Sequence, residues 1–428
     1  MFFSGALNTN PNNNPTTNPT NSPIATPGAT NTPTTHTAVS VTSGSKTSVA
    51  SQTVGSSGGT IQVTDSSSPL NGLKIVVPPA TTPQNIQFTV SYADISNVDG
   101  LPTGASPASE LITIDASGSD DFNQYDMLEK PVEVTLPYDA SAENDDSNPV
   151  RFYWYDSQNA KLDSVGFLRE DKNAHTITFL TASFSDFLAI EVDLALSELS
   201  GTSTYSVDTG FRPAINGWFI PNYGSVQTPG GMCLGMVSYA KWFYTYHYAD
   251  TGLYSKYIEG DSAEWRDDAT AIQLATRAHL ATSGIWNSLT QEERGWAEAN
   301  AREVGLSWLS GMIVTGEPQL IGLKAQDASG QWLNYAHAVM TYAYSNGQFQ
   351  IYDPNFPGSA YGDRMRTIPF TYSDGFTETY VSGTTRSDSL VFNIFYHAGA
   401  KLSATPGDYQ GLYDSAQSKF QGSSTSQP

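Results

Sequence analysis

Short runs in which apolar and polar residues alternate recur through the first half of the chain, separated by turn-forming residues. Alternation with a period of two is typical of strands that bury one face. Seven runs follow this pattern, at residues 60–63, 73–77, 86–90, 132–136, 151–155, 176–179 and 187–190. Seven short strands at this spacing predict an all-β sandwich over residues 51–194.

The pattern changes after Asp193, where apolar and aromatic residues recur at helical spacing. Residues 232–249, 268–280 and 290–304 predict three helices, and Thr290 and Glu293 form a capping-box pattern at the start of the third. Strands are predicted at 319–324, 336–344 and 348–352, with Asn346-Gly347 as a hairpin signal between the last two. Helices followed by antiparallel strands predict an α+β domain over residues 200–403. We expect its core to be separate from that of the sandwich, with the link near residues 195–201.

Both ends of the chain lack the pattern of a folded domain. Residues 1–50 are dominated by Asn, Thr, Pro, Ser, Gly and Ala, which cannot bury a core, so we expect a disordered stalk. Residues 404–428 predict a tail with one short helical pattern at 409–420. The fold class is therefore multidomain: a stalk, an all-β sandwich and an α+β domain.

Charge and composition restrict the partners of the chain. Lys and Arg total 20 against 42 Asp and Glu, for a net charge of −22, so phosphate backbones and anionic lipid surfaces are repelled and nucleic-acid binding is not expected. No apolar run is long enough for a membrane-spanning segment. Charged residues make up only 14% and aromatic residues 12%, a balance typical of an exported β-rich protein.

Two further features bear on location. Phe3-Ser4-Gly5 resembles the end of a bacterial lipoprotein signal, with Ala6 where the lipid-carrying Cys is expected, which leaves open a lipid anchor in the native precursor. No glycosylation sequon is present, which favours a prokaryotic source. We therefore expect an extracellular or cell-surface protein of a prokaryote.

The sequence indicates neither a metal nor a cofactor. A single cysteine, Cys233, can form neither an internal disulfide nor a thiolate zinc cluster. The acidic stretches at 115–126 and 143–146 lack the ligand spacing of a known calcium loop, so we interpret them as solvated surface.

The chemistry-bearing residues lie in the second half. Glycines 230 and 231 deliver Cys233 to the first turn of a predicted helix, where the helix dipole favours a thiolate. His337 begins a predicted strand, and Asp353 follows the next strand along the chain. The two side chains share a sheet face if the hairpin has a three-residue loop or a bulge, and lie on opposite faces with a strict two-residue loop.

This arrangement resembles the papain-like cysteine peptidase clan over residues 210–360, and the Cys-Leu-x-Met and Tyr-Asp-Pro patterns are similar to its bacteriocin-processing branch. The resemblance implies that Cys233 is the nucleophile, that His337 is the base and then the acid, and that Asp353 orients its ring. It further implies that Gln227, six residues before the cysteine, is an oxyanion donor. Asn355 is a second candidate for the orienting role. In the first half, Gly58-Gly59 before a strand, the Val-Val-Pro-Pro edge at 76–79 and the closing Phe184-Ser185-Asp186-Phe187 follow one another in an order that resembles the sandwich domain found in ankyrins and netrin receptors.

The residues leave three functions open. The first is an exported cysteine hydrolase that cleaves peptide or related amide bonds in a peptide or protein substrate. The second is a transglutaminase-like acyl transferase, which shares the order Cys, strand His and Asp but does not need Gln227. The third is a surface binding or adhesion protein that has lost activity, in which Cys233 is an inert core thiol, His337 a sheet residue and Asp353 a turn residue.

Overall fold

The structure is a computed structural model of the 428-residue chain. It describes residues 38–81, 84–118, 128, 130–142, 148–194, 206–247, 252–258, 269–286, 300–357, 366–382, 390–399 and 404–424. Outside these residues lie most of the predicted stalk, the predicted link at 195–201, most of the acidic stretch 115–126, the stretch 143–146, and the capping box of Thr290 and Glu293.

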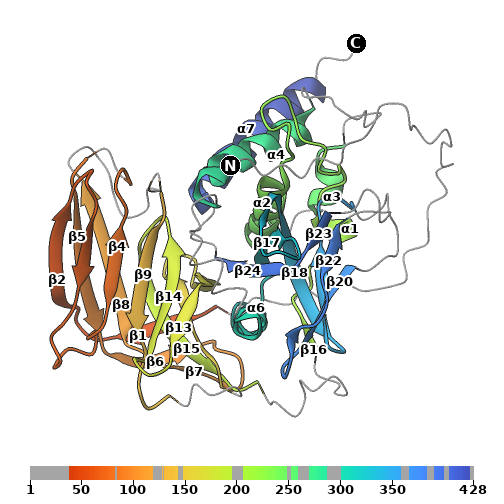
Figure 1. Ribbon diagram of the computed structural model, residues 1–428. Coiled ribbons are helices and arrows are strands. Elements are labelled where there is room, and N and C mark those ends of the chain that lie inside the picture. The colour runs from red at the N-terminus through yellow and green to blue at the C-terminus, as the bar shows by residue number, and fades with distance from the viewer. Residues whose placement is uncertain are drawn as a thin grey trace.

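The first half of the chain consists of antiparallel sheets (Figure 1). All seven predicted strands are present. One sheet has the order β11-β10-β15-β8-β5-β2, with β7 added on β15. Its strands are β2 (Thr47–Val54), β5 (Ile86–Ala93), β7 (Ala105–Pro107), β8 (Leu111–Gly118), β10 (Val150–Asp156), β11 (Lys161–Ser164) and β15 (Asp186–Val192). The second sheet has the order β13-β14-β9-β4-β3. Its strands are β3 (Gly59–Gln62), β4 (Lys74–Val77), β9 (Val132–Pro137), β13 (Arg169–Asp171) and β14 (Thr176–Thr181).

Aromatic side chains join the two sheets. The ring of Phe179 on β14 lies 6.3 Å from that of Phe152 on β10 and 5.6 Å from that of Phe187 on β15, between ring centroids. All three are buried, as the alternating pattern of these strands requires. The two sheets therefore share one core.

The expected end of the stalk at residue 50 is wrong. β1 (Ser40–Ser43) pairs with β6 (Ile95–Asp99), and β2 pairs with β5. These strands are rich in Ser and Thr and are mostly exposed, so they lack the apolar alternation from which the other strands were predicted. Pairing through the backbone needs no particular side chain, which explains why composition alone misplaced the boundary.

The second half is built on a sheet with the order β12-β24-β17-β18-β19-β20-β21, with β16 added on β18. Its strands are β12 (Gly166–Phe167), β16 (Ser206–Asp208), β17 (Gln319–Gln326), β18 (Trp332–Ser345), β19 (Gln348–Tyr352), β20 (Arg366–Thr371), β21 (Gly375–Phe376) and β24 (Ile394–Ala398). A separate hairpin pairs β22 (Tyr380–Ser382) with β23 (Leu390–Phe392). The helices are α1 (Pro213–Asn216), α2 (Cys233–Tyr246), α3 (Leu253–Lys256), α4 (Thr270–Trp286), α6 (Ala301–Thr315) and α7 (Pro406–Ser424).

Helix α2 is the central helix of this half. It packs on β18 on one side and on α4 and α7 on others (Figure 1). Every residue from Cys233 to Tyr244 is buried, as expected of a helix that is covered all round. The first residue of α2 is thus fixed against the middle of the sheet.

The expectation of two separate cores is wrong in one respect. β12 belongs to the sandwich segment of the sequence, yet it pairs with β24, so Phe167 lies opposite His397 in the sheet of the second half. A strand of two residues carries no readable period, and it therefore escaped prediction.

The C-terminal segment is a packed helix rather than a tail. Thr405 and Asp408 form a capping box at the start of α7, since each backbone N–H is bonded by the other side chain. Tyr409 is buried, with its ring centroid 5.9 Å from those of both Tyr239 and Trp242 on α2. None of the helices that the structure describes is long and apolar enough to cross a membrane.

Candidate active site

The site begins where the chain enters α2. Gly231 has a φ of 110°, a conformation that favours glycine, and a Cβ there would lie 3.0 Å from the side-chain amide of Asn222. The next residue, Met232, donates its backbone N–H to Oδ1 of Asn222 at 2.5 Å. Cys233 is the first residue of the helix and is 1% exposed. The first amides of a helix have no acceptor within it, so they favour negative charge at this thiol.

The hairpin of β18 and β19 places His337 and Asp353 on one face. Asn346 and Gly347 both have positive φ values, and Ser345 pairs with Gln348, so the loop has two residues. The register shifts between Thr341 and Ala343, which adds one residue to β18. A two-residue loop alone would place His337 and Asp353 on opposite faces of the sheet, and the bulge brings them to the same face.

His337 and Asp353 form a buried ion pair. Nε2 of His337 lies 2.7 Å from Oδ1 of Asp353, and the two residues are 0% and 2% exposed. Burial alone disfavours a charged imidazole, but the carboxylate of Asp353 outweighs it and raises the pKa of His337 to about 10. Burial likewise opposes the charge of Asp353, but His337 outweighs it and lowers the pKa of this carboxyl to about 2.

The other ring nitrogen of His337 is left for the thiol. Nδ1 makes no regular hydrogen bond within the described part of the chain. The thiol of Cys233 is nevertheless near enough to interact with the ring and contributes, after Asp353, to its raised pKa. A thiol, an imidazole and a carboxylate therefore lie together in the order expected of a Cys-His-Asp site.

A network of hydrogen bonds holds the carboxylate from its far side. Tyr380 donates its hydroxyl to Oδ2 of Asp353 at 2.7 Å, and Ser382 donates to the same oxygen at 2.9 Å. The backbone N–H of Asn355 donates to Oδ1 at 2.9 Å, and its side-chain amide donates to Ser382 at 2.8 Å. Asn222 donates to the side-chain carbonyl of Asn355 at 3.0 Å, so the network returns to the start of α2.

The sequence does not predict that Tyr380, Ser382 and Asn222 belong to this site. Tyr380 and Ser382 come from β22, which has no sequence signal linking it to Asp353, and Asn222 lies in a loop before the glycines. The side chain of Asn355, the second candidate for orienting His337, bonds Ser382 and Asn222 instead.

The other buried histidines are unlike His337. His279 on α4 and His397 on β24 are also buried, and burial lowers their pKa values to about 4 and about 3. Ser307 lies 3.0 Å from Nδ1 of His397, and Gln319 lies 3.2 Å from its Nε2. Both histidines are neutral core residues at neutral pH.

Gln227 stands apart from this cluster. It lies at the tip of a turn in which Ser225 and Thr228 exchange backbone hydrogen bonds, and its side chain is exposed. Within the described part of the chain, its side chain forms no hydrogen bond with the residues around Cys233. Its role as an oxyanion donor stays a prediction.

Comparisons with known proteins do not identify the site. The sequence matches no model of a protein family, and a search of curated proteins finds no significant match. Among the described residues, no group of three or more His, Cys, Asp or Glu side chains is arranged to hold a metal ion.

Proposed function

We propose that the chain is a papain-like cysteine hydrolase that cleaves peptide or related amide bonds. The observation that carries the proposal is the buried pair of His337 and Asp353, with the free ring nitrogen left for the thiol at the start of α2. The thiolate of Cys233 attacks the carbonyl carbon, and His337 gives its proton to the leaving amine. His337 then takes a proton from the water that attacks the thioester, the acyl group leaves as a carboxylic acid, and the thiolate and the protonated His337 are restored.

The oxyanion of such a reaction needs donors near the nucleophile. The backbone N–H of Cys233 is at the first position of α2, where a helix supplies no acceptor. A side-chain donor has two candidates in this chain: Gln227 by its spacing, and Asn222, whose side-chain amide donates one N–H to Asn355 and has a second N–H near the start of α2. Asn222→Ala and Gln227→Ala, compared by kcat, separate them.

The test of the proposal is thiol-dependent hydrolysis. We expect the full chain to cleave a quenched fluorescent casein, and Cys233→Ser to lower kcat/KM by more than about a thousandfold, since the alcohol of serine is a far weaker nucleophile than a thiolate. Iodoacetamide is expected to label Cys233 at neutral pH and to abolish cleavage in step with labelling. An inert thiol together with absent cleavage would instead favour the binding protein.

A transglutaminase-like acyl transferase is the second candidate, because the exposure of Gln227 removes the argument that favoured a peptidase over it. The two activities share the acyl-enzyme and differ in the acceptor, water or an amine. Incorporation of dansylcadaverine into casein, faster than peptide-bond cleavage and unaffected by Gln227→Ala, would favour the transferase.

A further inference from the structure

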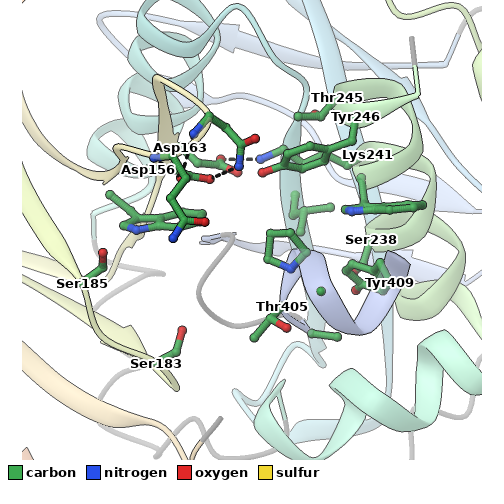
Figure 2. Close-up of a pocket in the computed structure, with 18 of the residues that line it drawn as sticks. Asp156, Asp163, Ser183, Ser185, Ser238, Lys241, Thr245, Tyr246, Thr405 and Tyr409 are labelled. Carbon is green, nitrogen blue, oxygen red and sulfur yellow. Dashed lines mark hydrogen bonds and ion pairs between the residues drawn. The ribbon is translucent and has the colours of Figure 1, made fainter. Parts of the chain in front are cut away.

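A cavity of about 280 Å³ lies between the sandwich, helix α2 and the start of α7 (Figure 2). Its wall includes Trp154 and Asn159 from the sandwich, Ser238 and Trp242 from α2, and Thr405 before α7. Neither Cys233 nor its two partners line it. The cavity is therefore separate from the candidate active site, although both use α2.

Of the charged side chains that line the cavity, Lys241 and Asp163 are paired with each other, while the carboxylate of Asp156 accepts hydrogen bonds from the amides of Gln158 and Asn159. Nζ of Lys241 lies 2.5 Å from Oδ1 of Asp163 and 3.8 Å from Oε2 of Glu317, and Figure 2 shows the first of these pairs. Lys161 lies 3.4 Å from the other oxygen of Glu317. Two ammonium groups thus balance two carboxylates, and the cavity offers a ligand no unpaired charge from this cluster.

The same pairing excludes a serine hydrolase at this place. Ser238 and Lys241 lie three residues apart on α2, as a Ser-Lys dyad would. Burial favours a neutral lysine, but Asp163 and Glu317 outweigh it and raise the pKa of Lys241. An ammonium that keeps its proton cannot serve as a base.

Two hydroxyl groups in the wall have hydrogen-bonding capacity to spare. Oγ of Ser238, a residue that is 3% exposed, has no hydrogen-bond partner among the described residues, and neither has Oγ1 of Thr245. A buried hydroxyl without a partner is costly, which points to a bound group that supplies one. The rings of Trp154, Trp242 and Tyr246 give the same wall apolar faces.

We propose that this cavity binds one sugar ring, or a neutral polyhydroxylated molecule of that size. Its volume is close to about 300 Å³, the lower end of the range for ligand pockets, which suits a single ring rather than a peptide. Hydroxyl groups of a sugar satisfy Ser238 and Thr245, while its C–H faces pack on the aromatic rings. Lys241 is already paired and Asp156 carries a negative charge, so the cavity disfavours an anion, and its unpartnered hydroxyl groups suit a neutral ligand. The inference does not depend on the proposed hydrolase activity.

The experiment uses the full chain and three probes, D-glucose, D-galactose and N-acetyl-D-glucosamine. Binding is followed by saturation-transfer NMR and by tryptophan fluorescence, and we expect saturation by one of them with a Kd on the order of 1 mM, as the efficiency of small ligands implies. Ser238→Ala is expected to weaken that binding by about fivefold, the effect of one hydrogen bond. Thr245→Val gives an independent second variant.

The matched control is Ser310→Ala, because Ser310 is also a buried helical serine whose hydroxyl lacks a partner in the described residues, and it does not line the cavity. Near-UV circular dichroism checks that each variant is folded. No saturable binding of any of the three sugars, or equal weakening by Ser238→Ala and Ser310→Ala, would overturn the proposal. Preferential binding of an anion such as sulfate at this cavity would overturn it too.

Discussion

Tyr380 and Phe392 face each other across the hairpin of β22 and β23, and each contacts one member of the buried ion pair. Tyr380 donates to Asp353, while the ring of Phe392 stacks on that of His337 with centroids 5.9 Å apart. One cross-strand pair therefore holds the carboxylate and covers the imidazole. Both Phe392 and His337 are fully buried.

The first prediction concerns Tyr380→Phe, which keeps the ring and removes only the hydroxyl. With one donor fewer, the charge of Asp353 is less stable, so the pKa of this carboxyl should rise. The readout is the NMR titration of the Asp353 carboxyl, which needs no assay of activity. Tyr335→Phe is the control, since its hydroxyl donates to the backbone of Val391 in the same hairpin. An unchanged Asp353 titration would show that Tyr380 is only packing.

Asp353→Asn separates orientation from charge. The carbonyl of Asn can still accept from His337, and the hydroxyls of Tyr380 and Ser382 can turn to accept from its amide, so the geometry survives. The charge is lost, and buried His337 is then expected to be neutral at pH 7. We expect kcat/KM to fall at least about a hundredfold, about 2.7 kcal/mol at 1.36 kcal/mol per tenfold. Activity within about tenfold of the wild type would mean that Asp353 only steers the ring.

The ion pair also predicts how stability depends on pH. The pKa of His337 is raised to about 10 from its usual 6.5, so its contribution is complete below pH 6.5 and is lost as pH rises toward 10. That of Asp353 is lowered to about 2, so its contribution is complete above about pH 4 and is lost as pH falls toward 2. The pair therefore stabilises most between pH 4 and 6.5.

Urea unfolding at several pH values measures this. Between pH 6.5 and 9, the free energy of unfolding should fall by up to about 1.4 kcal/mol per pH unit more steeply in the wild type than in His337→Gln. His397→Gln is the control, because the pKa of His397 is lowered and its contribution is instead lost as pH falls below 6.5. Parallel alkaline slopes for wild type and His337→Gln would contradict the ion pair.

Gly399→Ala tests the contact between the two halves. A Cβ at Gly399 would lie 1.9 Å from the carbonyl carbon of Val165, just before β12, so the chains must separate. We expect a loss of at least about 2 kcal/mol in the free energy of unfolding and a transition that splits into two steps. Gly411→Ala, on the open side of α7, meets nothing within 4 Å and should be neutral or slightly stabilising. A single unchanged transition in Gly399→Ala would show that the pairing of β12 and β24 adds little.

Periodic signals in the sequence predicted most of the framework. β19 begins and ends at the predicted residues. The hairpin pattern predicts that His337 and Asp353 lie either on one face of the sheet or on opposite faces, and the bulge at Thr341–Ala343 places them on one face. Such features are local, because each depends on residues that are neighbours in sequence.

The elements that escaped prediction have long-range causes. Tyr380 and Ser382 act on Asp353 only because the fold brings β22 to the end of β19, and neither residue type marks a site by itself. The partners of β1 and β12 lie far along the chain, and their side chains carry no period. One signal was readable, since Thr405 and Asp408 have capping-box spacing and mark the start of α7.

The strand β12 limits how this protein can be divided. β12 belongs to the sandwich segment of the sequence but pairs with β24, so it forms one edge of the sheet that carries His337. A fragment starting after the sandwich would expose that edge, and bare sheet edges recruit other chains. A protein expressed without the sandwich would therefore be expected to self-associate through this edge of the second half.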